Sequence, residues 1–243
     1  MNSNKILPVE NERQLSPSEK KGLATYWWKI LSIVLLLFTI IAGFLFPVPA
    51  QPILHETIRN LYFHVPMWFS MMTILFVSVW HSIKHLSQSN IESDIVASQA
   101  AHTGMLVGFL GLITGSLWAR YTWGAWWVAD TKLNGAAITM LIYLAYFVLR
   151  GSIDEEQKRA RIAAVYNIFA FVMLIVFLLI LPRMNDSLHP GNGGNPGFNK
   201  YDLDSTMRMV FYPAVAGWIL LTVWIFTLRI LLEKLKRKIL FND

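Results

Sequence analysis

The sequence predicts an all-α polytopic membrane protein: a bundle of six transmembrane helices with a Trp-rich outer loop. Three observations lead to this fold class. Hydrophobic residues make up 55% of the 243 residues and charged residues only 15%, outside the range of ordinary soluble domains. Six apolar runs each approach the roughly 20 residues that a helix needs to cross a membrane. Backbone groups in lipid must be hydrogen-bonded within their own segment, so we expect these runs to be helices.

The predicted spans, in chain order, are 27–46, 61–80, 101–119, 133–149, 162–181 and 209–228. The first carries Lys29 near its start, and the fourth is short and begins within the polar run 130–134. In the third span, four glycines at spacings of four, three and four share one helix face, where a neighbouring backbone can approach closely. These glycines are Gly104, Gly108, Gly111 and Gly115.

The distribution of Lys and Arg predicts the orientation of the bundle. One side carries Lys5, Arg13, Lys20, Lys21, Lys84, Arg150, Lys158, Arg159, Arg161, Lys234, Lys236, Arg237 and Lys238. The other carries Arg59, Arg120, Lys132, Arg183, Lys200 and Arg208. The positive-inside rule therefore predicts cytoplasmic termini. Most of the net charge of +6 is this orientation signal, and nothing in its pattern points to nucleic acid.

This orientation divides the chain into three parts. We expect a cytoplasmic segment over 1–26, a membrane domain over 27–229 with outer loops 47–60, 120–132 and 183–208, and a basic cytoplasmic tail over 230–243. The polar N-terminal stretch shows no cleavable signal peptide, so the first span should remain as a helix. The chain has no cysteine, which excludes a disulfide, a thiolate metal site and covalent haem attachment through Cys-x-x-Cys-His.

Tryptophan is concentrated in the connection between the third and fourth spans, from Trp118 to Asp130. An aromatic belt needs only one or two such rings at a helix end, so this density is too high for anchoring alone. Trp123, Trp126 and Trp127 surround Gly124. A loop of this composition offers a broad, flat, apolar surface, which suits a large planar ligand such as a porphyrin.

Two histidines fall on the same side of the membrane as this loop. His64 lies at the outer start of the second span and His189 follows the fifth, while His55 is in the first outer loop. Neutral imidazole is a preferred axial ligand of haem iron, and two imidazoles fill both axial positions. The other three histidines, His81, His85 and His102, lie at the inner ends of the second and third spans.

Three motifs, in this order on a six-span chain, resemble the CcmC family of system I cytochrome c maturation. They are Tyr-x-His-Val-Pro at 62–66, Trp-Gly-x-Trp-Trp-x-x-Asp at 123–130 and Leu-His-Pro-Gly at 188–191. The resemblance covers the chain from about Trp27 to Arg229. It implies a protein of the bacterial inner membrane that holds haem b non-covalently, with His64 and His189 as axial ligands. It also implies delivery of haem to a periplasmic haem chaperone, in association with an ABC-type complex, rather than conventional enzymatic turnover.

The sequence departs from the family motif at two positions. Ala129 stands where the family has a tryptophan, which reduces the apolar surface. Lys132 stands at a basic position that is commonly Arg; it keeps the positive charge but lacks the planar guanidinium, which can donate two hydrogen bonds to a carboxylate. Lys132, Arg120 and Arg59 are candidates for the haem propionates, and Arg59 matches an Arg of the family; an interfacial role for Arg59 is the alternative.

We expect haem to lie on an open shelf at the membrane surface rather than in a buried pocket. Asp130 has three candidate roles: a cap for the fourth span, a partner for Lys132 or a contact to the chaperone.

Two other classes of protein stay open. One is an electron-transfer cytochrome, in which His81 or His85 pairs with His102 around a second haem. The other is a non-haem membrane subunit of a transporter, in which the tryptophans serve only as anchors.

Overall fold

The computed structural model describes residues 17–50, 53–189 and 203–241, and part of the predicted third outer loop, residues 190–202, lies outside them. The described elements are helical. They are α1 (Pro17–Leu45), η1 (His55–Asn60), α2 (Leu61–Gln88), α3 (Ile91–Trp123), α4 (Thr131–Gly151), α5 (Glu156–Ile175), η2 (Val176–Ile180), α6 (Leu181–Met184) and α7 (Ser205–Phe241).

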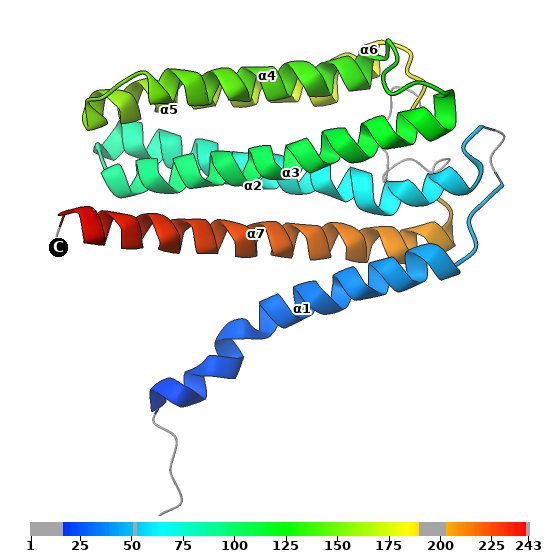
Figure 1. The fold of residues 1–243 in the computed structure, drawn as a ribbon, viewed down its shortest axis with the longest axis horizontal. Coiled ribbons are helices and arrows are strands. Elements are labelled where there is room, and N and C mark those ends of the chain that lie inside the picture. Colours follow the sequence, from blue (N-terminus) through cyan, green and yellow to red (C-terminus); the bar gives the residue numbers. More distant parts are fainter. Residues whose placement is uncertain (1–16, 51–52, 190–202, 242–243) are drawn as a thin grey trace, which may run out of the picture.

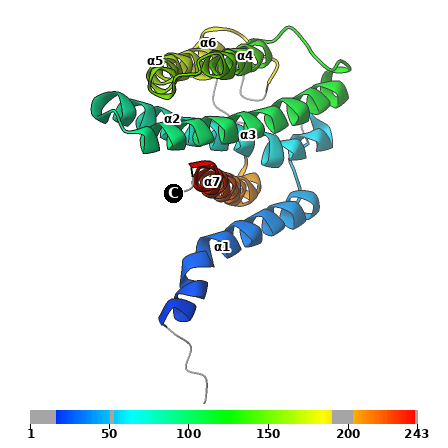
Figure 2. The ribbon, with the colours of Figure 1, turned by 60° about the vertical axis from the view of Figure 1, so that its left-hand side comes forward.

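The helices stack in layers (Figure 1). The pair α4 and α5 forms one outer layer, α2 and α3 form the middle layer, and α7 packs beneath them. The C-terminal part of α1 packs on α7, and its N-terminal part points away from the bundle, which both views show (Figure 2). We call the end at which α3 gives way to α4 the Trp-loop end, and the end at which α2 turns into α3 the opposite end.

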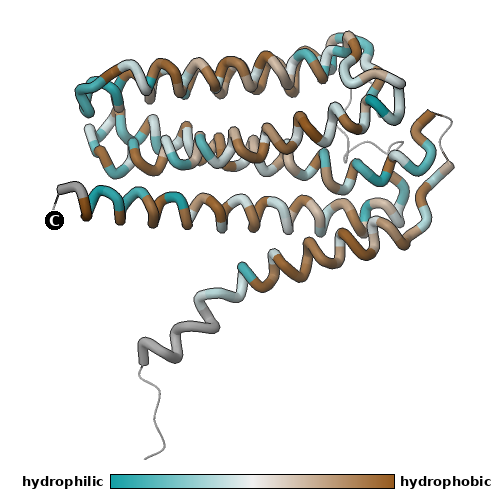
Figure 3. Tube along the Cα trace, viewed as in Figure 1, coloured by the Kyte–Doolittle hydropathy of each residue, from teal (hydrophilic) through white to brown (hydrophobic). Residues whose placement is uncertain are grey.

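Six helical segments are long and apolar enough to cross a membrane, which confirms the predicted spans. They are 25–45, 55–88, 91–123, 131–151, 156–184 and 205–239. Most are longer than the apolar runs because their polar ends continue the helix, as the change of colour along the chain shows (Figure 3). Many large apolar side chains are exposed on these segments, as expected for surfaces that face lipid.

The glycine face predicted for the third span is a close helix contact. A Cβ atom added at Gly108 would lie 2.5 Å from Met71 Sδ, and one at Gly104 would lie 2.6 Å from the Leu75 side chain. Farther along α3, Gly111 meets the ring of Trp68. The absence of side chains on this face of α3 therefore lets α2 pack directly against its backbone.

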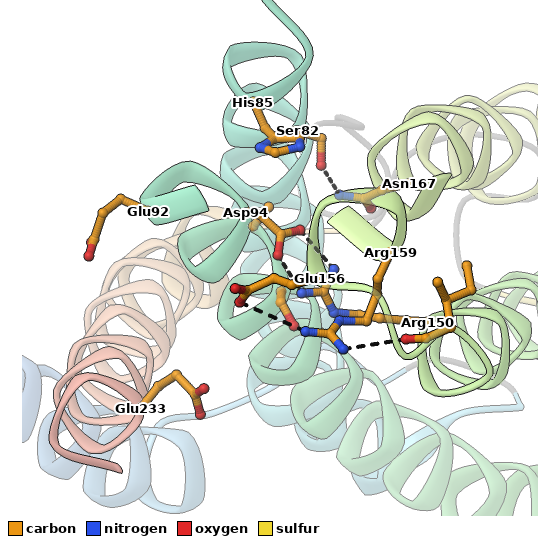
Figure 4. A network of polar contacts seen from close by, with 12 residues as sticks. Ser82, His85, Glu92, Asp94, Arg150, Glu156, Arg159, Asn167 and Glu233 are labelled. Atoms are coloured by element: carbon orange, nitrogen blue, oxygen red, sulfur yellow. Dashed lines mark hydrogen bonds and ion pairs between the residues drawn. The ribbon is translucent and has the colours of Figure 1, made fainter. Parts of the chain in front are cut away.

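The opposite end is held by buried polar contacts (Figure 4). Arg150 of α4 donates two hydrogen bonds to the Asp94 carboxylate of α3, at 2.7 and 2.5 Å. Asn167 of α5 donates to Ser82 of α2 at 2.8 Å. Each contact joins two different helices and pairs a donor with an acceptor where water is excluded.

The fifth span contains a π-helical segment that the sequence did not predict. Helix α5 continues directly through η2 into α6, which begins next to Pro182. Helix α4 approaches this segment backbone to backbone, because a Cβ added at Gly135 would lie only 2.4 Å from the Phe177 carbonyl oxygen. Segments of π-helix occur frequently at functional sites, and this one forms one wall of the cavity described next.

Candidate functional site

An apolar cavity opens at the Trp-loop end between α2, α3, α4 and the end of the fifth span. It contains about 1070 Å³ of empty space, part of which is open solvent beyond the opening. The described residues that line it are Leu61, His64, Val65, Trp68, Phe69, Met72, Gly111, Leu112, Gly115, Ser116, Trp118, Trp127, Lys132, Leu133, Ala136, Leu178, Leu179, Pro182 and His189.

His64 lies in the first turn of α2 and is buried against α3. Its Nδ1 is 3.1 Å from the Thr114 hydroxyl, and the Trp68 indole N–H donates to its Nε2 at 3.2 Å. The Thr114 hydroxyl can donate to its own helix at Leu110 O, 2.9 Å away, so it can accept from a protonated His64 Nδ1. Gly115 makes room for the ring, because a Cβ there would lie 2.6 Å from His64 Cε1.

His189 follows α6 and reaches the same cavity from the other side of the bundle. Its Nδ1 lies 3.0 Å from Asp130 Oδ1. The ring of Trp123 packs edge-on against the imidazole, with 5.2 Å between the ring centroids. The backbone N–H of His189 donates to the Ser187 hydroxyl at 3.2 Å.

Asp130 caps α4, which is one of the three roles that the sequence left open, and also binds the His189 segment. Its Oδ1 accepts from the backbone N–H of Lys132 and of Leu133, at 2.8 and 3.3 Å. Its Oδ2 accepts from the Ser187 hydroxyl at 2.9 Å and from the Leu188 N–H at 2.7 Å. Burial alone would raise the pKa of the Asp130 carboxyl, but the hydrogen bond and charge of His189, with these donors, hold the pKa well below its ordinary value.

The tryptophans of the loop take different positions. Trp118 is buried, with its ring centroid 5.8 Å from that of His64, and its indole N–H donates to Thr57 at 3.2 Å. Trp127 lines the cavity and donates to Asn134 Oδ1 at 3.1 Å. Trp126, in contrast, is 60% exposed. Gly124 ends α3 with φ +80°, a conformation that side chains disfavour, and so turns the chain into the loop.

The three side chains that the sequence suggested for the haem propionates lie in different places. Lys132 lines the cavity at the start of α4. Arg59 lies outside it: its guanidinium donates to Gly43 O and Phe46 O, at 2.8 and 2.7 Å, and forms an ion pair with Glu56. Arg120 is exposed and donates to Gly124 O at the end of α3. In this structure Arg59 and Arg120 thus stabilise helix ends, and Lys132 is the cation of the cavity.

The expected open shelf is replaced by a cavity between helices. The surface exposure of His64 is only 8%, because its helix packs against the glycine face of α3. Sequence reasoning also missed three residues that contact the two histidines: Trp68, Thr114 and Ser187. Only Trp68 could have been found from the sequence, because it follows His64 by four residues and so lies on the same face of the helix.

Two of the three histidines at the opposite end make local hydrogen bonds, whereas the buried Nδ1 of His81 has no hydrogen-bond partner among the described residues. His85 is buried and its Nδ1 donates to Asn90 O at 2.9 Å, while His102 Nδ1 donates to Ser98 O at 2.8 Å. The His102 ring also packs on Phe147, with centroids 4.3 Å apart. Among the described residues, no group of three or more His, Asp or Glu side chains forms a metal cluster.

The fold and the site define a multi-pass membrane protein with a histidine-lined apolar cavity at one end of its bundle. The chain belongs to the CcmC family, heme exporter protein C, whose family model matches residues 14–242. It is 28% identical over 175 residues to the heme exporter protein C of Rhodobacter capsulatus, covering 72% of each chain. It is 26% identical over 212 residues to that of Escherichia coli K12, covering 84% of this chain and 80% of the relative.

Proposed function

We propose that this protein binds haem non-covalently in the cavity at the Trp-loop end and passes it on for cytochrome c maturation. The observation that carries the proposal is that His64 and His189, which are 125 positions apart in the sequence, line one apolar cavity. Two imidazoles are suited to the two axial positions of haem iron. The names of the family and of its relatives, heme exporter protein C, agree with haem as the cargo.

The cavity residues fit the rest of a haem molecule. Trp118, Trp127 and the aliphatic side chains of α2 and α4 provide contacts for the porphyrin plane. The Lys132 ammonium is placed to bind a propionate at the rim. The rings of Trp123 and Trp126 lie beyond this lining, the first supporting His189 and the second exposed. We assign to Trp126 a contact with the haem chaperone that accepts haem from the cavity.

We further propose that the Trp-loop end faces the periplasm of a bacterial inner membrane, with both termini in the cytoplasm. The excess of Lys and Arg at the opposite end supports this orientation. Haem in the cavity would then be accessible to a periplasmic haem chaperone. An ABC-type complex of the same maturation system is the expected membrane partner, with its contacts on surfaces outside the cavity.

Replacement of each ligand tests the proposal. We expect His64→Ala and His189→Ala each to convert six-coordinate low-spin haem into a five-coordinate or poorly retained form. Added imidazole should partly restore the low-spin spectrum, because the vacated site can accept it. His55→Asn is the matched control: His55 is exposed at the same end, and Asn tolerates its positive φ of 44°. Unchanged spectra in both ligand variants would refute the assignment.

A further inference from the structure

The carboxylate of Asp130 is in contact with Nδ1, one of the two ring nitrogens of His189. The two side chains are 1% and 16% exposed, and Asp130 Oδ1 lies 3.0 Å from His189 Nδ1. An ionised carboxylate only accepts hydrogen bonds, so this contact requires a proton on Nδ1. In the neutral imidazole the lone pair is then on Nε2.

Asp130 is itself fixed by groups other than His189. Two backbone N–H groups at the start of α4 hold Oδ1, and the Ser187 hydroxyl and Leu188 N–H hold Oδ2. The carboxylate therefore joins the N-terminus of α4 to the segment that carries His189. The two donors from α4 hold the carboxylate independently of His189, so the carboxylate determines where the imidazole sits.

We propose that Asp130 is a positioning residue that selects the Nδ1-protonated tautomer of His189 and presents Nε2 to the iron. The inference rests on the proposed haem site and extends it. A carboxylate partner on the outer nitrogen of a ligating histidine orients the ring and raises its basicity. His64 has the neutral Thr114 hydroxyl in the same position, so the two ligands differ in donor strength, with His189 the stronger.

Asp130→Asn tests this role because Asn is as good a helix cap as Asp but carries no charge. In the haem-free protein, ¹⁵N spectra of labelled histidine, assigned with the His189→Ala variant, should show the Nδ1-protonated tautomer in the wild type and a mixture in Asp130→Asn. In the haem-bound protein, the variant should release haem about 10- to 100-fold more readily. Its midpoint potential should rise, because a neutral partner stabilises the ferric state less.

Asp204→Asn is the matched control. Asp204 caps α7 at the same end, accepting from Met207 N at 2.7 Å, and does not line the cavity. This variant should leave the tautomer, the haem release and the potential as in the wild type.

The outcomes separate the two proposals. Absence of haem from the wild type, or wild-type spectra in His189→Ala, would refute the haem site itself. If His189→Ala changes the spectrum but Asp130→Asn matches the wild type in tautomer and potential, the haem site stands and the positioning role is wrong. An Nε2-protonated His189 in the haem-free wild type would also refute the positioning role, and this result does not depend on the folding of any variant.

Discussion

The two histidines differ in how ready they are to bind a metal. Nδ1 of His189 contacts Asp130, so Nε2 is the ring nitrogen that the proposed haem site would use. The Nε2 atom of His64, in contrast, accepts a hydrogen bond from Trp68. Coordination through His64 Nε2 therefore requires the indole N–H to give up this bond, whereas His189 Nε2 has no hydrogen-bond partner among the described residues.

Trp68→Phe tests this competition. Phe keeps an aromatic ring beside the cavity but has no N–H, so His64 Nε2 loses its present partner. A hydrogen bond of this kind has a net value of about 1 kcal/mol, so we expect haem affinity to rise about fivefold in a titration of the purified protein. A fall in affinity would show instead that the indole contributes to binding.

Gly115→Ala tests the space that α3 leaves for His64. The new methyl group would lie 2.6 Å from His64 Cε1, and overpacking of this kind costs about 1–3 kcal/mol. The ring must shift, so haem affinity and the low-spin fraction should both fall. Gly151→Ala, where a Cβ meets nothing within 4 Å, should bind haem as the wild type does. Equal haem binding in both variants would contradict the observed fit.

At the scale of elements, the Trp loop has an inner and an outer part. Gly124 ends α3, and the chain then places Trp127 in the cavity and leaves Trp126 exposed. Asp130 caps the start of α4 with one carboxylate oxygen and holds the segment after the fifth span with the other. The loop is therefore both a wall of the cavity and the surface next to its opening.

Separate replacement of Trp126 and Trp127 distinguishes these parts. Trp127→Ala removes an apolar contact on the order of 80 Å², worth about 2 kcal/mol or roughly thirtyfold in haem affinity. Trp126→Ala should retain haem but weaken crosslinking to a haem chaperone. The measurements are haem content and capture by a crosslinker at the Trp-loop end. Equal haem loss in both variants would mean that the loop acts as one platform.

The sequence predicted the helices better than the contacts between them. Apolar length and the glycine spacing of α3 are local signals, and both were confirmed. The cavity was predicted as an open shelf, because the burial of His64 depends on how two helices meet. The contact of Asp130 with His189 joins positions 59 residues apart, and no local pattern encodes it. The π-helical segment η2 likewise leaves no recognisable signal in an apolar run.

At the scale of the whole molecule, the two ends of the bundle differ in the kind of contact between their helices. The opposite end is closed by a buried ion pair between α3 and α4 and by hydrogen bonds between α2 and α5 (Figure 4). The Trp-loop end instead has an apolar cavity between α2, α3, α4 and the segment formed by η2 and α6. A ligand that leaves toward water must therefore leave at the Trp-loop end.

The proposed orientation can be tested with single cysteines, since the chain has none of its own. Ile53, which is 67% exposed at the Trp-loop end, and Gln157, exposed at the opposite end, are suitable sites. In intact cells a membrane-impermeant thiol reagent should label Ile53→Cys and not Gln157→Cys, while both should react after lysis. The reverse pattern would place the cavity on the cytoplasmic side and remove the proposed route to a periplasmic acceptor.

The ratio of haem to protein in purified wild-type material tests the central claim most directly. One cavity with two imidazole ligands predicts one haem per chain, with the spectrum of a single six-coordinate low-spin species. Two haems per chain would instead support a cytochrome with a second site near His81, His85 and His102. Protein that takes up no haem, and therefore shows no Soret band, would contradict the account and leave the tryptophans as membrane anchors.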